Sequence, residues 1–265
     1  MSDGTLRGVT DDRPGGLVDD EPSGHRLLDF NAPLSDARAG RLVASLGPLA
    51  GARVVDLGCG WAEMLLRVLA AEPTARGLGV DEDPEAVDRG TGNARVRGLA
   101  DRVRLEVGDV TDTSTRTDPA DVVLCIGASH AWGGTRAMLD AVRSATRQGG
   151  RALVGDGIWE RPPGAVALAA LDASADEFAS LSALVDLAME SGFRVLAVSV
   201  ASLDEWDDFE SRWCAGRERW LLDHPGHPDA GEVRRVVDQH RRAWLHGYRG
   251  VLGFAYLTLA LPGAG

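Results

Sequence analysis

A short glycine-rich stretch that follows an apolar run contains the residue types that bind a charged ligand through the backbone. Residues 53–57 have the pattern of a short buried strand, and the segment Gly58-Cys59-Gly60 follows it directly. Because glycine has no Cβ atom, Gly58 and Gly60 allow a ligand carboxylate to lie against the backbone, where the next helix offers its N-terminal N–H groups. Asp56 can accept a hydrogen bond from an ammonium group of the same ligand. The stretch therefore predicts a site for a ligand that carries both a carboxylate and a cationic group.

Two further acidic residues follow predicted strands at spacings that suit a nucleoside. Asp81 ends a second predicted strand about twenty residues after the glycines, where a carboxylate can bridge the two hydroxyls of a ribose. Asp109 comes just after a third predicted strand. The alternative interpretation is structural: the glycines would serve only a tight turn, and the two acidic residues would only cap helices. The joint spacing of all these residues favours ligand binding.

The elements that must position these residues alternate between strand and helix from about residue 52 to residue 155. Five apolar runs have the length and pattern of strands, and the segments between them carry helical spacing or helix-start signals. Such alternation predicts an α/β fold with a Rossmann-like, doubly wound, mostly parallel sheet, in which ligands bind at the carboxyl ends of the strands. The predicted strands are 53–57, 77–81, 103–107, 121–126 and 151–155, and the predicted helices are 62–71, 84–98 and 135–147.

The rest of the chain predicts two more strands, which makes seven, and a helical insertion before the last strand. A pair of helices over about residues 203–249 would form a lid beside the ligand crevice. Trp206, Trp213 and Trp220 share one helical face, which favours packing on the domain over an aromatic wall for a substrate. The other predicted elements are a helix at 178–191 and strands at 193–200 and 251–259.

Length and composition indicate one large domain. The chain has 265 residues, 44% of them hydrophobic, which suffices for a substantial core. Residues 1–24 are polar and rich in Gly, Pro and Asp, which predicts a disordered N-terminal arm rather than a secretion signal, with the domain over residues 25–265. No apolar run reaches the roughly 18 to 20 residues that a membrane span needs. The three cysteines lie far apart, which disfavours disulfides and zinc and favours a cytoplasmic location.

The charged residues exclude several classes of function. The formal net charge is −12, and a surface this acidic repels phosphate backbones, so nucleic acid is not an expected partner. The chain contains no lysine, which excludes a lysine Schiff base and with it pyridoxal-phosphate chemistry. No cluster of His, Cys and carboxylate residues has metal-ligand spacing, so no metal is expected. The expected partner is a small-molecule substrate, with no role for a membrane.

Taken together, the run from Asp56 to Gly60, Asp81, Gly108-Asp109-Val110 and Gln148-Gly149-Gly150 resembles the class I methyltransferases that depend on S-adenosyl-L-methionine (SAM). The resemblance covers about residues 50–156. The family pattern is an acidic residue followed by Gly-x-Gly-x-Gly, and Ala62 stands here at the third glycine. A dinucleotide fingerprint would instead need glycine at position 63, which is Glu63, so a nicotinamide-dependent oxidoreductase is the weaker alternative.

The resemblance implies SAM as the cofactor, S-adenosyl-L-homocysteine as the product, and a set of cofactor-binding residues. Asp81 would bind the ribose, Asp109 the adenine amino group, and Val110 would pack on the adenine ring. The full set is Asp56, Gly58, Cys59, Gly60, Asp81, Glu82, Asp109, Val110 and Ile126.

Segments outside the cofactor site resemble a subgroup of small methyltransferases of actinobacterial appearance, to which we attach no substrate. They are Phe30-Asn31-Ala32-Pro33-Leu34, Ile126 to His130, Gly155 to Pro163 and Arg249 to Phe254.

Methyl transfer is an in-line displacement, so the protein must align the nucleophile with the methyl group and often supplies a base. His130 is the first candidate, because it ends the fourth strand–loop segment and an unperturbed imidazole titrates close to neutral pH. A histidine that only lines the pocket is an equally weighted alternative. Glu160 is the second candidate, and its alternative is a solvated carboxylate paired with Arg161.

Aromatic residues on the same loops, Trp132 and Trp159, are candidate substrate contacts. Phe30 and Tyr248 are further candidates, although core packing is favoured for Tyr248. The motifs of amino-methylating and cytosine-C5-methylating DNA enzymes are absent after the fourth predicted strand. The expected function is therefore that of a cytoplasmic SAM-dependent methyltransferase for a small molecule, acting as a monomer or homodimer. The main alternative is a protein of this fold that binds SAM without catalysis.

Overall fold

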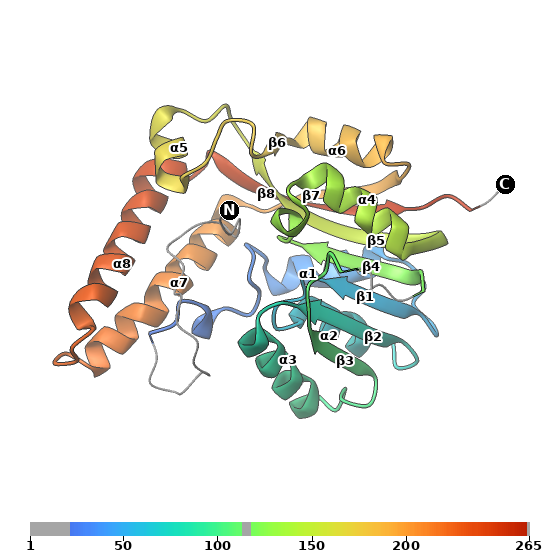
Figure 1. The fold of residues 1–265 in the computed structure, drawn as a ribbon, viewed down its shortest axis with the longest axis horizontal. Coiled ribbons are helices and arrows are strands. Elements are labelled where there is room, and N and C mark those ends of the chain that lie inside the picture. Colours follow the sequence, from blue (N-terminus) through green and yellow to red (C-terminus); the bar gives the residue numbers. More distant parts are fainter. Residues whose placement is uncertain (1–21, 113–117, 264–265) are drawn as a thin grey trace.

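The computed structural model of the chain describes residues 22–112 and 118–263. Its centre is an eight-stranded sheet with helices on both faces (Figure 1). The predicted disordered arm at residues 1–24 lies outside the described residues except for its last three, Pro22 to Gly24. No helix within the described ranges is both long and apolar enough to cross a membrane.

The sheet has the strand order β3-β2-β1-β4-β5-β8-β7, and the short β6 pairs with β5. The pairs from β3 to β5 are parallel, whereas β8 runs antiparallel to both of its neighbours, β5 and β7. This arrangement confirms the predicted Rossmann-like, mostly parallel sheet. The strands are β1 (Arg53–Leu57), β2 (Arg76–Asp81), β3 (Val103–Val107), β4 (Ala120–Ile126), β5 (Thr146–Trp159), β6 (Ala179–Ser180), β7 (Arg194–Val200) and β8 (Leu252–Ala260).

The two faces of the sheet support separate cores. Val54 belongs to the core under α1 and α2, and its neighbour Val55 belongs to the core under α4 and α6, as expected of a central strand whose side chains alternate. Two 3-10 helices, η1 (His25–Leu27) and η2 (Ser129–Trp132), lie near the carboxyl ends of the strands. The other helices before β7 are α1 (Asp36–Ser45), α2 (Glu63–Ala71), α3 (Pro84–Val96), α4 (Thr135–Ala145), α5 (Ala165–Leu171) and α6 (Leu181–Glu190).

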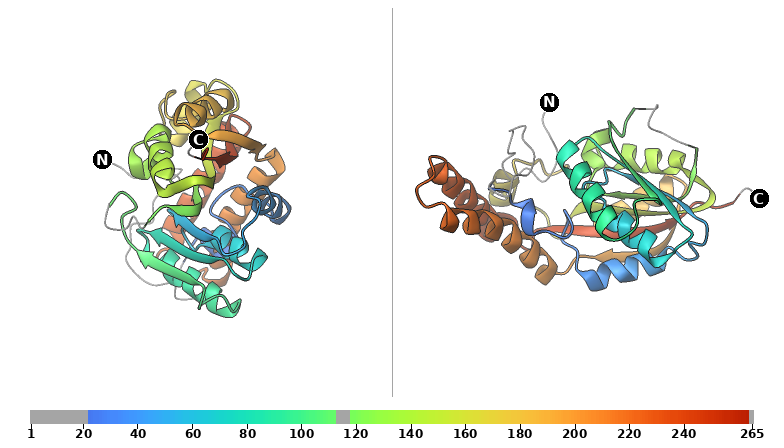
Figure 2. Two further views of the ribbon diagram at one scale, coloured as in Figure 1. Left: turned by 90° about the vertical axis from the view of Figure 1, so that its right-hand side faces the viewer. Right: turned by 90° about the horizontal axis from the view of Figure 1, so that it is seen from below.

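A helical insertion between β7 and β8 projects from one end of the sheet, as Figures 1 and 2 show. It consists of α7 (Leu203–Asp223), α8 (Ala230–Ala243) and the single π-helical turn η3 (Trp244–Tyr248). Ser202 and Glu205 form a capping box at the start of α7, which fixes where this helix begins. The insertion occupies the position of the predicted lid.

The tryptophan stripe of α7 is buried. Trp213 and Trp220 belong to a separate apolar cluster with Val233 and Val237 of α8, and Trp206 lies in the core under α1 and α2. The packing interpretation of the stripe is therefore confirmed. The apolar contact with α8 explains why α7 and α8 form a paired unit.

Several details of the fold differ from the sequence-based expectation. The short β6 makes eight strands rather than seven. Strand β5 begins at Thr146, where the predicted helix 135–147 was expected to continue, and runs to Trp159 rather than ending at residue 155, because its pairing with β8 continues through Asp156 and Gly157. The helix expected from residue 178 begins at Leu181, since Ser180 belongs to β6 and its side chain caps the helix. The short helix α5 was not predicted from the sequence.

Candidate functional site

The glycine loop after β1 adopts the backbone conformation that its residue types predict. Gly58 has φ 71° and its N–H donates to the Val80 carbonyl at 2.9 Å. A Cβ atom at position 58 would lie 2.5 Å from the Cβ atom of Ala128, so the loop after β1 packs directly on the loop after β4. Gly60 has φ 51°, and a Cβ atom there would meet no atom within 4 Å. The backbone at Gly60 therefore faces open space that a ligand can fill.

Ala62, at the third position of the family glycine pattern, has a left-handed backbone. Its φ is 56° and its ψ is 23°, and it is the N-cap residue of α2. An L-residue with a Cβ atom pays roughly 1 to 2 kcal/mol in this region, which glycine avoids. The alanine therefore adopts a backbone conformation that favours glycine, at a cost in strain.

Asp56 is a buried carboxylate beside this open space, with only 4% of its surface exposed. Burial, and then the negative charge of Asp81, raise the pKa of Asp56 to about 7. Within the described residues its side chain accepts no hydrogen bond. A buried carboxylate without a protein donor fits a cationic group supplied by a ligand, such as the ammonium group of SAM.

Asp81 ends β2 and is held by two backbone donors. Its carboxylate accepts from the N–H of Gly60 at 2.6 Å and from the N–H of Asp83 at 3.0 Å. Asp81 thus holds the glycine loop and is half-buried at the strand end, the position that the sequence predicts for ribose binding. Glu82 is exposed beside it.

The other predicted cofactor residues lie along the same edge of the sheet. Asp109 is exposed after β3, and it accepts from the Thr111 N–H at 2.8 Å and from the Thr111 hydroxyl at 2.7 Å, which lowers the pKa of Asp109. Val110 is buried in the core that contains Leu57, and Ile126 ends β4. Cys59 donates its N–H to Val80 within the glycine loop. The structure therefore brings the predicted set together at the carboxyl ends of β1 to β4.

His130 lies in η2, directly after β4, and is half-buried. A buried carboxylate that the sequence did not single out, Asp156 of β5, anchors this loop. Asp156 accepts from the Ser129 hydroxyl at 2.9 Å and from the Thr135 hydroxyl at 2.6 Å. Burial raises the pKa of Asp156, and hydrogen bonds and the proximity of His130 oppose that rise. Asp156 therefore holds both ends of the segment that carries His130.

Glu160 follows β5 and is exposed at the start of β8. Its side chain lies over Gly253, where an added Cβ atom would stand 2.6 Å from the Glu160 Cγ. Arg161, the partner expected for a merely solvated Glu160, donates to the Gly250 carbonyl at 2.8 Å. Among the described residues, Arg161 therefore bonds to the backbone of Gly250 and does not form the ion pair with Glu160 that the alternative interpretation expects.

The four aromatic residues predicted to contact substrate lie in different surroundings. Trp159 is buried, donates its indole N–H to the Ala175 carbonyl at 2.9 Å, and packs edge-on against Phe178. Trp132 is half-buried in η2, and its buried indole N–H has no partner among the described residues. Phe30 is buried under the guanidinium of Arg67. Trp132 and Trp159 lie on the loops after β4 and at the end of β5, whereas Phe30 lies on the N-terminal segment.

Tyr248 belongs to a buried polar cluster that the sequence did not reveal. Its hydroxyl donates to Glu210 at 2.6 Å, and the second oxygen of Glu210 lies 2.5 Å from His240 Nε2. His240 stacks on Trp213 with ring centroids 3.7 Å apart. The buried environment of Tyr248 agrees with core packing, which the sequence favours for this residue. The three polar residues come from α7, α8 and η3, so no local spacing could have indicated them.

A cavity of about 330 Å³ lies between residues 28–36 and the first half of α7. Phe30, Leu34 and Phe209 line it together with acidic side chains of both segments. None of its lining residues belongs to the glycine loop, so this cavity lies apart from the predicted cofactor residues.

Comparisons with known proteins agree with this geometry. A family model described as a methyltransferase domain matches residues 54–150. The crystal structure of a SAM-dependent methyltransferase from Geobacter sulfurreducens in complex with S-adenosyl-L-homocysteine is 26% identical with a TM-score of 0.82, and the match covers 92% of this chain and 98% of that one. The uncharacterized protein YjhP of Escherichia coli is 26% identical over 89% of this chain and 94% of its own length. The mitomycin biosynthesis 6-O-methyltransferase of Streptomyces lavendulae is 30% identical over 57% of this chain and 44% of its own length.

Proposed function

Because the chain is a class I SAM-dependent methyltransferase with SAM as its cofactor, we propose that it methylates a small-molecule acceptor and that His130 is the base. The observation that carries the proposal is the packing of Gly58 on Ala128, which places the cofactor loop against the segment that carries His130. The net charge of −12 disfavours a nucleic-acid acceptor. The similarity to a mitomycin biosynthesis 6-O-methyltransferase supports an acceptor of low molecular mass.

The strand ends would hold the cofactor through complementary charge and hydrogen bonds. Asp56 would bind the ammonium group, Gly60 would leave room for the amino-acid portion, and Asp81 would accept from the ribose hydroxyls. Asp109 and Val110 would contact the adenine, as the sequence predicts. When bound, SAM supplies a methyl group on a positively charged sulfur, which needs no activation by the protein.

The acceptor side would use the loops after β4 and β5. His130 would remove a proton from the attacking group, and Asp156 would keep the His130 segment in place through Ser129 and Thr135. Trp132 would offer an apolar surface with an indole N–H that has no partner among the described residues. Glu160 is the second candidate for contact with a polar group of the acceptor, and Trp159 would contribute its buried ring.

Transfer of labelled methyl groups from SAM to fractionated metabolite pools tests this proposal. The wild-type chain should label at least one small molecule, and His130→Ala should slow that transfer by about 100-fold or more if His130 is the base. The affinity for S-adenosyl-L-homocysteine, measured by calorimetry, should stay within about twofold in the same variant, since His130 is not among the proposed cofactor contacts.

His246, in the π-helical turn of the lid insertion, provides a matched control. His246→Ala also removes an imidazole, and it should leave the labelling rate unchanged. A His130→Ala variant with the wild-type rate would remove His130 from the proposed role. Cofactor binding without any labelled product would favour the alternative of a binding protein without catalysis.

A further inference from the structure

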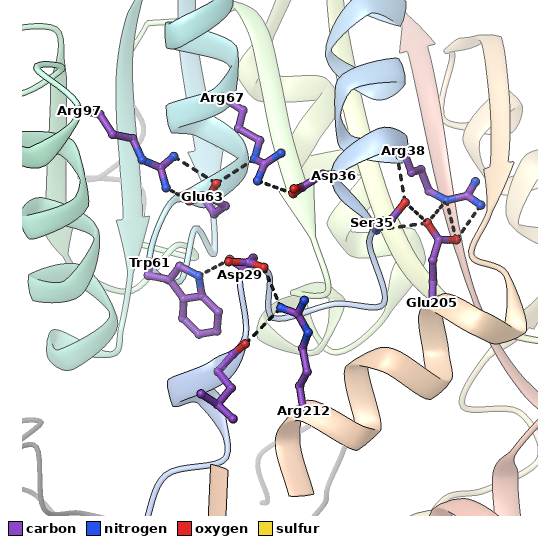
Figure 3. A network of polar contacts seen from close by, with 11 residues as sticks. Asp29, Ser35, Asp36, Arg38, Trp61, Glu63, Arg67, Arg97, Glu205 and Arg212 are labelled. Carbon is purple, nitrogen blue, oxygen red and sulfur yellow. Dashed lines mark hydrogen bonds and ion pairs between the residues drawn. The ribbon is translucent and has the colours of Figure 1, made fainter. Parts of the chain in front are cut away.

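Trp61, directly after the glycine loop, is held by a segment from the N-terminal part of the chain. We call residues 23–36 the strap. The Trp61 indole N–H donates to the Asp29 carbonyl of the strap at 2.7 Å (Figure 3). The His25 ring lies 5.8 Å from the Trp61 ring. Trp61 is only 6% exposed. The residue next to Gly60 is therefore fixed from outside the glycine loop, by the strap.

Arg89 of α3 joins the strap to the same tryptophan. Its guanidinium lies 4.0 Å from the centre of the Trp61 ring, a cation–π contact. It also donates to the strap carbonyls of His25 at 2.9 Å and Leu28 at 2.6 Å. The strap therefore contacts two segments beside the proposed ribose site. One is the segment after the glycine loop, which contains Trp61, and the other is α3, which begins just after Asp81 and Glu82.

The opposite side of the strap is tied to the lid helix α7. Arg212 donates to the Asp29 carboxylate at 2.8 Å and to the Leu27 carbonyl at 3.3 Å. Figure 3 shows Asp29 between Trp61 and Arg212. Asp29 of the strap thus contacts Trp61 through its backbone carbonyl and the lid helix α7 through its side chain.

A close backbone approach fixes the start of the strap on α7. At Gly216, in the middle of α7, an added Cβ atom would lie 2.5 Å from the Ser23 carbonyl oxygen. Gly24 is buried against Trp213 of the same helix. Glycine is unfavourable inside a helix, so its presence at 216 has a packing reason, which is the room it gives to the strap.

We propose that the strap couples the position of the α7–α8 lid to cofactor binding, with Arg212 and Gly216 as positioning residues. A displaced α7 would withdraw the strap from Trp61 and so loosen the backbone at Gly60. Conversely, a cofactor that orders Gly60 and Trp61 would hold the strap and α7 in the position described here, because coupling between two sites is reciprocal. The inference rests on cofactor binding and is independent of the acceptor and of His130.

Replacing Gly216 tests the coupling without removing a hydrogen-bonding side chain. Gly216→Ala favours the helix but collides with the strap, whereas Gly231→Ala on α8 also favours a helix and meets no atom within 4 Å. Calorimetry with S-adenosyl-L-homocysteine should show affinity about 5- to 50-fold weaker in Gly216→Ala, a range typical of coupled sites, and unchanged affinity in Gly231→Ala. Wild-type affinity in a folded Gly216→Ala variant would overturn the proposal.

A second pair of variants keeps the test valid if Gly216→Ala does not fold. Arg212→Gln should weaken binding of S-adenosyl-L-homocysteine, and Arg212→Lys, which keeps a cationic donor for Asp29, should restore most of it. Arg235→Gln on α8 removes an exposed arginine whose partners, among the residues that the structure describes, lie on its own helix, and should bind like the wild type. Equal affinity in Arg212→Gln and the wild type would contradict the coupling.

Hydrogen exchange separates a positioning role from a general loss of stability. In the wild type, S-adenosyl-L-homocysteine should slow exchange in the strap and in α7 as well as at the start of α2. In Arg212→Gln, protection should remain at α2 and disappear from the strap and α7. Absence of ligand-induced protection in the wild-type strap would refute the proposal. A wild-type chain that binds the ligand but methylates nothing would refute only the proposed function.

Discussion

Among single residues, Asp56 combines a cost in stability with the proposed role in binding the cofactor. Its raised pKa, about 7 against a usual 3.8, means that the folded protein without ligand holds a proton that the unfolded chain releases at a lower pH. Stability contributed by this protonated carboxyl group is therefore present below pH 3.8 and is lost as the pH rises to about 7. A cationic ligand reverses this cost, because it stabilises the ionised form.

Asp56→Asn should separate the two effects. Without ligand, the variant should be more stable than the wild type at pH 8, by up to about 4 kcal/mol, because the neutral amide avoids burial of a charge. The advantage should shrink as the pH falls toward 4. Urea unfolding across this pH range measures it. The same variant should bind S-adenosyl-L-homocysteine at least about tenfold more weakly at pH 8, since it has no charge to pair with the ammonium group.

Asp88→Asn, at an exposed position of α3, controls for the loss of one negative charge. It should alter neither stability nor ligand affinity. An Asp56→Asn variant that is less stable than the wild type at pH 8 would show that the Asp56 carboxylate has a stabilising partner in the folded protein.

The candidate site residues whose positions could be predicted from the sequence are those that local spacing places at strand ends. Gly58, Gly60 and Asp81 lie at strand ends that short apolar patterns reveal, and the structure places them together at one edge of the sheet. Asp156 could not be found in this way, because its partners Ser129 and Thr135 lie on another segment, and only the tertiary fold brings them together. The Glu210–His240–Tyr248 cluster was missed for the same reason.

Among the elements, the start of α7 depends on one carboxylate more than on helix propensity. Glu205 accepts from Ser202 N–H at 2.8 Å within the capping box, from the Ser35 hydroxyl at 2.6 Å, and from Arg38 at 2.7 Å. These donors lower the pKa of Glu205 to about 2 despite the opposing effect of burial. The same side chain therefore caps α7 and joins it to α1.

Glu205→Gln should destabilise the fold by about 2 kcal/mol at pH 7, because it weakens charge-assisted hydrogen bonds to partly buried donors. The pKa of Glu205 is lower in the folded state than the usual 4.5, so its stabilisation is present above pH 4.5 and is lost as the pH falls toward 2. The difference between variant and wild type in urea unfolding should therefore shrink at pH 3. Glu232→Gln, whose partner Arg235 is exposed on the same helix, should show almost no effect at either pH.

Elements with a strong local pattern were predicted well, and elements that depend on pairing were not. Strand β1 and helix α3 start at the predicted residues, since an apolar run and an N-terminal proline mark them. Strand β5 extends beyond its apolar run because β8 supplies hydrogen bonds to Asp156 and Gly157 as well. Helix α5 is short and packs against η3, and no local sequence pattern predicts this contact.

In the whole molecule, the last strand of the chain occupies an interior position of the sheet. Strand β8 pairs with β5 from Arg151 to Trp159 on one side and with β7 on the other. Its side chains Tyr256 and Leu257 are fully buried and belong to opposite cores. Both cores and both neighbouring strands therefore depend on the final segment.

A chain that ends at Arg249 should lose cooperative unfolding, because β5 and β7 would each lose a hydrogen-bonded neighbour and both cores would lose buried side chains. Removal of residues 262–265 alone should leave the unfolding midpoint within about 2 °C of the wild type, since Pro262 and Gly263 are exposed. Calorimetric scans of the two truncated chains distinguish these outcomes. Cooperative unfolding of the shorter chain near the wild-type temperature would contradict the role assigned to β8.

The central place of β8 has a consequence for biosynthesis. A ribosome releases the glycine loop and its neighbouring parallel strands early, while the segment that completes the sheet is still being translated. Until β8 leaves the exit tunnel, β5 and β7 have open edges and the lid helices lack their covalent connection back to the sheet. The nascent protein thus completes its sheet only after β8 has left the exit tunnel, and its period of greatest exposure to aggregation falls between the emergence of β7 and that of β8.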